Sequence, residues 1–443
     1  MRASKINILL KEILMEFKQS CSSKLVLVLW SSLFVSGITS VFSNEVTNEI
    51  HSSTPISILQ ESANPYVLDL NEEEQKNAKS VLSGSFMPPS EVETSKFIQQ
   101  EGLDLTTKSS TESWGNVPSR IGLSIDGGGI RGVMPALWLQ TLKAAYEDEG
   151  EDGINAPFWK IFDYVGGTSI GGIISLGIAA ELTPDAIVKM FETQRNQIFS
   201  LEGRSLLQYL DFFGLYGHRY SATKLEGLLK LEENFGEDKR LSDLKTNILV
   251  TACTNDGHPW LFKKEEKHGE KDYKLWEVAR STSAAPTYFD AYQPQFPIQS
   301  HRPHLVDGGI WANNPSTLIT ASIVKEFHNG KFNPNKIHLL SLGTGDTNTP
   351  AIWQSAGKLS AGAIIEALMS SHNRGNHMLM DQLLGDNYHR INAEMTQAID
   401  LADISGGAYV KMEEYAGKKE HNEKIVGFVN QTATIIRKKL END

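Results

Sequence analysis

Three glycine-containing motifs carry the side chains in this chain whose types and spacing suit catalysis. The first is Gly167-Thr168-Ser169-Ile170-Gly171, which lies between a short apolar run and a helix-like run. A serine in a sharp turn between a strand and a helix presents its hydroxyl as a nucleophile, and glycines two residues away on either side relieve the crowding. The positive end of the following helix favours the negative charge that develops during attack on a carbonyl. We therefore predict that Ser169 is a nucleophile, the alternative being a tight turn with an incidental serine.

The second motif, DGGGIRG at 126–132, combines consecutive glycines with one arginine. It satisfies the GxGxxG pattern of dinucleotide-binding folds, but those folds also need an acidic residue after the next strand, where this chain has the serine turn. Glycines at a helix start expose backbone N–H groups that can bind an oxyanion. We expect an oxyanion hole at Gly127, Gly128 and Gly129, and Arg131 adds a fixed positive charge. Nucleotide binding and a purely structural turn are the alternatives.

The third motif, Asp307-Gly308-Gly309, offers a base for the serine. An aspartate has a pKa of about 4 in water, but burial raises that pKa and direct contact with Ser169 would position the carboxylate for proton transfer. The alternative is an aspartate that caps N–H groups of its own turn. Several histidines sit in no recognisable turn at a strand end: His258, His301, His304, His338, His372 and His377.

A metal site is a rival interpretation of the segment before this aspartate. His301, His304 and Asp307 have the spacing of ligands on one helix face. Pro303 and the apolar strand that follows argue against a helix there. We therefore expect no metal and no cofactor.

Short apolar runs precede the three motifs and predict a strand before each. Runs with the properties of strands are 121–126, 161–165, 247–253, 337–343 and a strand end at 304–309. Helical spacing follows at Met134–Ala145 and at 171–180, and a further helix opens at Pro184 with Thr183 as its N-cap. This alternation predicts an α/β layer fold with a mainly parallel sheet. Because the carboxyl ends of parallel strands meet at one edge, the three turns should converge.

Beyond Asp346 the strand signal fades and helical spacing dominates. One helical face is formed by Ile425, Phe428, Val429, Thr432, Ile436 and Leu440. We predict an α/β catalytic domain at 119–350 and a helical extension at 351–443 that packs on it. Residues 45–118 are rich in Ser, Thr, Asn, Glu and Pro, which indicates a flexible polar linker or pro-like arm. The alternative is a few short helices packed on the catalytic domain.

Composition excludes several classes of protein. Charged residues make up 22% of the chain and hydrophobic residues 40%, which is typical of a core-forming globular protein and not of collagen, coiled coils or multi-span membrane proteins. The net charge of −12 provides no basic face for nucleic acid. Cys21 and Cys253 are the only cysteines, so a disulfide scaffold or a thiolate zinc site is excluded.

The first 44 residues have the form of an export signal. Residues 25–44 carry no charge, and basic residues precede them at Arg2, Lys5, Lys11, Lys18 and Lys24. A basic stretch, a short apolar run and then small residues are typical of a signal peptide. We expect 1–44 to direct export to a secreted or periplasmic location. The alternatives are an uncleaved membrane anchor through residues 25–43 and an amphipathic stretch that directs no export.

In this order and spacing, the three motifs resemble those of the patatin-like phospholipase family. The family patterns are Asp-Gly-Gly-Gly-x-Arg/Lys-Gly, Gly-x-Ser-x-Gly and Asp-Gly-Gly/Ala, matched in turn at 126–132, 167–171 and 307–309. Weaker likenesses occur at 279–289, 343–345 and 387–391. The similarity covers about 119–440.

This resemblance implies a lipid acyl hydrolase with a three-layer α/β fold, helices on both sheet faces and a helical C-terminal extension. Ser169 would be the nucleophile and Asp307 the base, with neither a catalytic histidine nor a metal. Gly127, Gly128 and Gly129 would frame the oxyanion hole, and Arg131 would support it. Gly167 and Gly171 would shape the elbow, as Gly308 and Gly309 would shape the aspartate turn.

The substrate implied is a lipid at a membrane or micelle surface. Two apolar-aromatic segments suit that contact, 206–216 and 289–296, unless they pack on the C-terminal tail. A catalytically silent lipid- or nucleotide-binding module and a Ser-His-Asp hydrolase are the competing hypotheses.

The leader makes one testable prediction. Protein recovered from its host should begin near Asn44 or Glu45, because Val41 and Ser43 form a tolerable cleavage site. N-terminal sequencing measures this directly. An intact Met1 or Met15 on protein from the cytoplasm would refute export, whereas an intact leader in a membrane fraction would establish the anchor instead.

Overall fold

The computed structural model describes residues 117–149, 153–199, 220–264, 272–295, 303–347 and 361–442. These belong to one unit of the chain, Thr111–Asp443. The predicted leader and most of the predicted linker therefore lie outside the described residues. Within the described ranges, no helix combines the length and apolarity needed to cross a bilayer.

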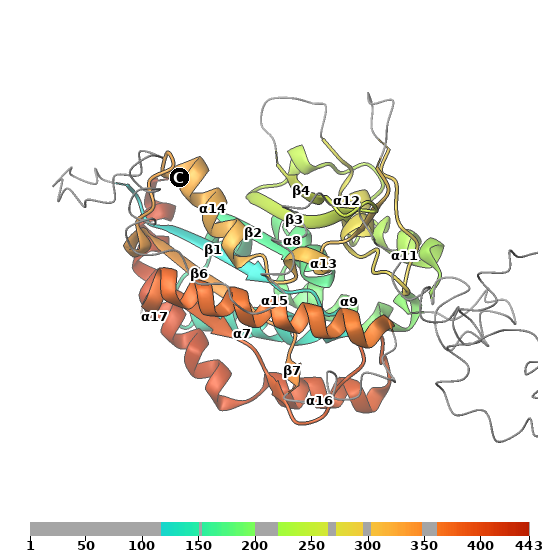
Figure 1. The fold of residues 1–443 in the computed structure, drawn as a ribbon. Coiled ribbons are helices and arrows are strands. Elements are labelled where there is room, and N and C mark those ends of the chain that lie inside the picture. Colours follow the sequence, from blue (N-terminus) through green and yellow to red (C-terminus); the bar gives the residue numbers. More distant parts are fainter. Residues whose placement is uncertain are drawn as a thin grey trace, which may run out of the picture. The chain divides into compact units, whose positions relative to one another are not determined.

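A central sheet with the strand order β4-β3-β2-β1-β6-β8 organises this unit, and β5 pairs with β3 beside that path (Figure 1). Strands β3, β2, β1, β6 and β8 run parallel, while β4 and β5 are antiparallel to β3. The strands are β1 (Arg120–Ile125), β2 (Tyr164–Thr168), β3 (Asn247–Thr254), β4 (Pro259–Lys263), β5 (Leu305–Asp307), β6 (Ile337–Leu342) and β8 (Tyr388–Ile391). Two short strands, β7 (Asp346–Thr347) and β9 (Glu394–Met395), pair with each other.

Helices cover both faces of the sheet, so the predicted three-layer α/β fold with a mainly parallel sheet is confirmed. The helices are α7 (Val133–Glu147), α8 (Ile170–Ala179), α9 (Pro184–Ile198), α11 (Ala222–Leu229), α12 (Leu275–Thr282), α13 (Gly309–Ala312), α14 (Ser316–Phe327), α15 (Ala361–Leu384), α16 (Gly406–Ala416) and α17 (Lys419–Asn442). The N-cap of α9 is also as expected, since the Thr183 hydroxyl accepts the Ala186 N–H at 3.2 Å.

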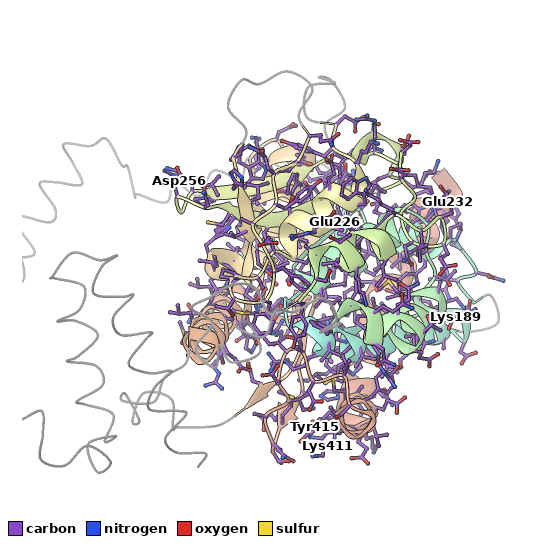
Figure 2. The ribbon with its side chains drawn as sticks, turned by 90° about the vertical axis from the view of Figure 1, so that its right-hand side faces the viewer. Lys189, Glu226, Glu232, Asp256, Lys411 and Tyr415 are labelled. Atoms are coloured by element: carbon purple, nitrogen blue, oxygen red, sulfur yellow. The ribbon has the colours of Figure 1, made fainter. Side chains whose placement is uncertain are left out.

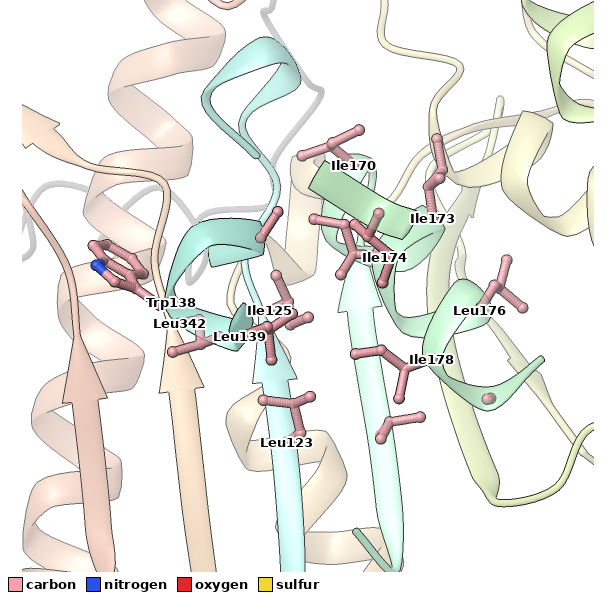
Figure 3. Packing of buried hydrophobic residues seen from close by; sticks show 14 of the residues in the cluster. Leu123, Ile125, Trp138, Leu139, Ile170, Ile173, Ile174, Leu176, Ile178 and Leu342 are labelled. Carbon is pink, nitrogen blue, oxygen red and sulfur yellow. The ribbon is translucent and has the colours of Figure 1, made fainter. Parts of the chain in front are cut away.

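Alternation along the strands divides the core into two layers. Leu123 and Ile125 of β1 point into the larger layer, where they pack with α7 and α8 (Figure 3). The opposite face packs against α14, whose Ile319 and Ile323 lie over the sheet. Gly122 makes this close approach possible, because a Cβ there would meet Leu339 at 2.8 Å and Ile319 at 3.2 Å.

One predicted strand lies further along the chain than expected. The strand expected at 161–165 begins at Tyr164, and Phe158–Ile161 before it forms a 3-10 turn. That turn buries Phe158 and Ile161 in the core, and a short apolar run does not by itself distinguish these conformations.

The C-terminal extension is not wholly helical. Residues Tyr388–Ile391 form β8, which pairs in parallel with β6 from Leu339↔Tyr388 to Leu342↔Ile391. Four residues are too few for their periodicity to predict a strand. This segment is a strand because its backbone pairs with the edge of β6. The helical face expected further on is present, since α17 buries Ile425, Phe428 and Ile436.

Candidate active site

Ser169 occupies a strained turn between β2 and α8. Its backbone has φ 54° and ψ −125°, a conformation that residues other than glycine adopt rarely. The residue is 8% exposed. This is the geometry expected for a serine elbow, in which local strain presents the hydroxyl at the start of a helix.

The elbow depends on the two flanking glycines for close backbone packing. A Cβ on Gly167 would lie 2.1 Å from the Gly171 carbonyl oxygen, and a Cβ on Gly171 would lie 2.3 Å from the carbonyl oxygen of Ile125. Any side chain at these positions would force the backbone apart. The two glycines therefore hold β1, β2 and α8 against one another.

Three threonines behind the elbow form a hydrogen-bonded group that no sequence motif marks. The Thr282 hydroxyl accepts the Ser169 N–H at 2.8 Å and donates to the Thr251 carbonyl oxygen at 2.6 Å. The Thr168 hydroxyl lies 2.7 Å from that of Thr251 and donates to the Ala312 carbonyl oxygen at 2.6 Å. These bonds anchor the strained residue from its buried side.

Asp307 ends β5 and lies beside Ser169. The short β5 runs antiparallel to β3, unlike the parallel arrangement from which we expected the turns to converge, and it places Asp307 opposite Ala252 near the carboxyl end of β3. The Asp307 carboxylate accepts the Gly309 N–H at 2.7 Å, and the neighbouring Ser169 side chain lowers its pKa. The structure thus brings the predicted nucleophile and base into contact.

Burial controls the acidity of this carboxyl. Asp307 is 5% exposed. Burial raises the pKa of Asp307 to about 6, and the hydrogen bonds from Ser169 and Gly309 lower that pKa only in part. The carboxyl group is therefore a better proton acceptor than a solvated aspartate, and it is still mostly ionised at neutral pH.

The glycine loop after β1 leaves two N–H groups for a ligand. The Gly127 N–H donates to the Asn313 carbonyl oxygen at 3.1 Å, so it is unavailable to an oxyanion. Among the residues that the structure describes, the N–H groups of Gly128 and Gly129 have no acceptor, and both residues line the pocket that contains Ser169. Gly128 must be a glycine, because a Cβ there would collide with Thr344 at 2.2 Å.

Arg131 belongs to this loop, but its guanidinium does not face the pocket that contains Ser169. Its guanidinium pairs with the Glu366 carboxylate of α15 at 3.0 Å, and the side chain is buried. Arg131 does not line the pocket. Its contact attaches the glycine loop to α15 and so positions the loop indirectly.

A buried ion pair fixes the start of the same loop. Asp126 is fully buried, and the Arg390 guanidinium meets both of its carboxylate oxygens at 2.9 and 2.5 Å. Burial lowers the pKa of Arg390, but attraction and hydrogen bonding to Asp126 outweigh burial and hold that pKa above its usual range. Arg390 also donates to the Ser341 hydroxyl at 2.8 Å. The only sequence signal for this residue is its place in the segment 387–391.

An apolar pocket opens beside Ser169 and Asp307, with an empty volume of about 920 Å³ including its mouth. Its walls include Ile173, Met190, Ile198, Leu225, Leu228 and Leu229. Figure 2 shows Glu226 on α11, where its carboxylate pairs with the buried Arg280 of α12 at 3.2 Å and joins these two helices. No histidine is among the described residues that line the pocket.

Two aromatic segments were expected to contact a lipid surface, and the structure describes only one of them. Residues 206–216 lie outside the described residues. Phe289 is 6% exposed, lines the pocket and packs on Tyr220 and Phe199. It is therefore part of the pocket wall and not an exposed docking residue.

Comparison with known proteins gives consistent matches. Residues 123–318 match a family model described as patatin-like phospholipase. A protein of Pseudomonas aeruginosa named cGAMP-activated phospholipase is 31% identical over 289 residues, which cover 63% of this chain and 80% of that protein. A Vibrio cholerae protein of the same name is 32% identical over 239 residues, covering 50% and 63%. Patatin-like protein 2 of Arabidopsis thaliana is 32% identical over 250 residues, covering 51% and 59%. The chain thus spans less than two thirds of the last two relatives.

The Asp126–Arg390 pair makes a prediction about stability. Arg390→Gln should lower the free energy of unfolding by about 3–5 kcal/mol, because it leaves a buried carboxylate without its partner. Urea unfolding followed by circular dichroism measures this. Lys419→Gln is the matched control, since the Lys419–Glu423 pair is exposed and should contribute little.

Adding Asp126→Asn to Arg390→Gln should restore part of the loss, because the double variant buries no unpaired charge. A loss below about 1 kcal/mol in the single variant would contradict the role given to this pair.

Proposed function

The chain belongs to the patatin-like phospholipase family, and from this we propose that it is a lipid acyl hydrolase that cleaves carboxylic ester bonds of membrane lipids. The observation that carries the proposal is that Ser169, in a strained turn, and the buried Asp307 both line one apolar pocket, where the Ser169 side chain lowers the pKa of Asp307. A serine needs a base to attack an ester, and here a carboxylate occupies that position.

Acylation begins with proton transfer within this pair. Asp307 accepts the hydroxyl proton as Ser169 Oγ forms a bond to the ester carbonyl carbon. The protonated Asp307 then returns the proton to the departing alcohol or lysolipid oxygen, whose bond to the acyl carbon breaks. The raised pKa suits both steps, because the group must accept and release a proton near neutral pH.

The oxyanion of the tetrahedral intermediate is held by backbone N–H groups. We assign this role to Gly128 and Gly129, whose N–H groups are free among the described residues, and not to Gly127. The loss of one such donor typically costs about 10²–10³-fold in rate.

The apolar pocket suits the acyl chain of a lipid. An acyl chain lying between α8, α9 and α11 would leave water, which favours binding at roughly 25 cal/mol per Å² of apolar surface buried. Deacylation reverses the chemistry. Asp307 removes a proton from water as the water oxygen attacks the acyl carbon, and Ser169 leaves as the restored hydroxyl.

The alternative of a catalytically silent nucleotide-binding module has less support. One N–H of its glycine loop already donates to Asn313, and the strand after that loop is followed by Ser169 and not by an acidic residue. Two relatives are named for activation by cGAMP. Activity should therefore be measured both with and without cGAMP.

The first test separates a Ser–Asp dyad from a Ser-His-Asp triad. Ser169→Ala should reduce hydrolysis of a short-chain ester and of a phospholipid to background. Asp307→Asn should reduce acylation by about 10²–10⁴-fold, because an amide cannot accept the serine proton. Labelling by a fluorophosphonate probe provides a second readout of the nucleophile.

Single His→Gln variants are the controls in this test, and each should retain substantial activity. The dyad would be overturned by a folded histidine variant as inactive as Asp307→Asn. Retention of more than a few per cent of turnover in Ser169→Ala would overturn the elbow assignment.

The second test is the pH dependence of kcat/KM on a soluble ester. Only ionised Asp307 can accept the proton, so activity should rise with pH and level off above a pKa of about 6. About a tenth of the enzyme would be active at pH 5 and about nine tenths at pH 7. A rate that stays flat or falls across this interval, in protein that remains folded by circular dichroism, would contradict Asp307 as the base.

A further inference from the structure

Helix α15 exposes large apolar side chains along one side. Leu368, Met378, Leu379 and Leu383 are 50%, 57%, 50% and 43% exposed, and we call these four residues the α15 apolar face. The opposite side of the helix packs on the sheet through Met380 and Leu384. Figure 1 shows α15 on the near side of the unit, in front of the sheet.

Helix geometry places these residues on one side of the helix. At about 100° per residue, Leu379 and Leu383 lie within about 60° of Leu368, and Met378 lies at the edge of the same face. The four residues span about 22 Å from Leu368 to Leu383. Met378, Leu379 and Leu383 are close neighbours on this side, whereas Ser371, His372 and Gly375 separate them from Leu368. A cluster of exposed apolar side chains of this kind can mark a contact site.

This face carries no formal charge. The other positions on it, between 366 and 384, are Ser371, His372, Gly375 and Gln382. Arg374 and Asp381 lie one turn before and one turn after Met378 and border this face. Glu366 lies on another side of the helix and is paired with Arg131. An uncharged face favours a partner that offers hydrocarbon and no particular charge.

The α15 apolar face continues into the mouth of the pocket. Met369, next to Leu368, lines the pocket together with Ser169 and Asp307. Ile310 of α13 also lines it and is 46% exposed. A Cβ on Gly309 would lie 3.6 Å from the Met369 methyl group, which places the start of α15 directly beside the turn of Asp307.

We propose that the α15 apolar face docks the protein on an electrically neutral lipid layer, with the pocket mouth against that layer. The inference rests on the proposed function, because it is the continuity with a lipid-accepting pocket that selects lipid as the partner. The net charge of −12 gives no general attraction to anionic membranes, so apolar insertion is the driving force.

The test uses the full chain and vesicles of phosphatidylcholine. Leu379→Asp combined with Leu383→Asp should lower vesicle binding in a co-sedimentation assay by at least about tenfold, because two charges would enter the lipid interface. Hydrolysis of vesicle lipid should fall in parallel. Turnover of a soluble short-chain ester should stay within about twofold, since neither residue lines the pocket.

Val410→Asp and Val426→Asp are matched controls. Val410 of α16 and Val426 of α17 are 51% and 49% exposed but are isolated apolar residues on other helices. Both variants should bind vesicles as the unmodified chain does. Binding that increases at higher salt, or is unchanged by salt, fits apolar docking, whereas strong loss with salt would overturn it.

Unchanged vesicle binding in the α15 double variant would overturn the proposal. A difference in oligomeric state between the unmodified chain and the double variant, measured by sedimentation velocity, would also overturn it. Such a difference would show that the α15 apolar face joins two copies of the chain. The two hypotheses can fail separately. If the unmodified chain binds vesicles but hydrolyses no ester, and the double variant no longer binds vesicles, the proposed function is wrong while the docking surface is supported.

Discussion

The buried ion pair between Asp126 and Arg390 is the constraint on which the candidate site depends. It joins the end of β1 to β8, with β6 between them in the sheet, and so ties the glycine loop to the C-terminal part of the chain. Two charges withdrawn from water are tolerated only when hydrogen bonds satisfy them, and here both carboxylate oxygens are bonded. Because the three glycines follow directly, this pair fixes the point at which their loop begins.

Two residues of the candidate site are kept in energetically unfavourable states by the structure around them. Ser169 keeps a backbone conformation that costs energy, and hydrogen bonding to Thr282 and close packing of Gly167 and Gly171 hold it there. Asp307 keeps a carboxylate away from water, which raises its pKa to about 6. Strain presents the proposed nucleophile, and burial provides the proposed base with an acidity suited to its task.

Helix α15 connects this chemistry to the surface of the unit. Its Glu366 holds Arg131 of the glycine loop, its Met369 lines the pocket, and its outer side carries the α15 apolar face. One helix thus contacts the loop, the pocket and the surface proposed to meet lipid.

The sequence by itself determined the features that depend on neighbouring residues. Glycines around Ser169 and beside Asp307, and apolar runs before them, predicted the elbow, the aspartate turn and the α/β fold, because crowding and periodicity are local properties. Their catalytic roles stay predictions. Only the tertiary structure decided that Arg390 neutralises Asp126, that Tyr388–Ile391 is a strand, that β5 is antiparallel and that the Gly127 N–H is occupied by Asn313. Each of these depends on partners that lie far apart in the chain, and no local spacing records which strand edge or carbonyl group a distant residue will meet.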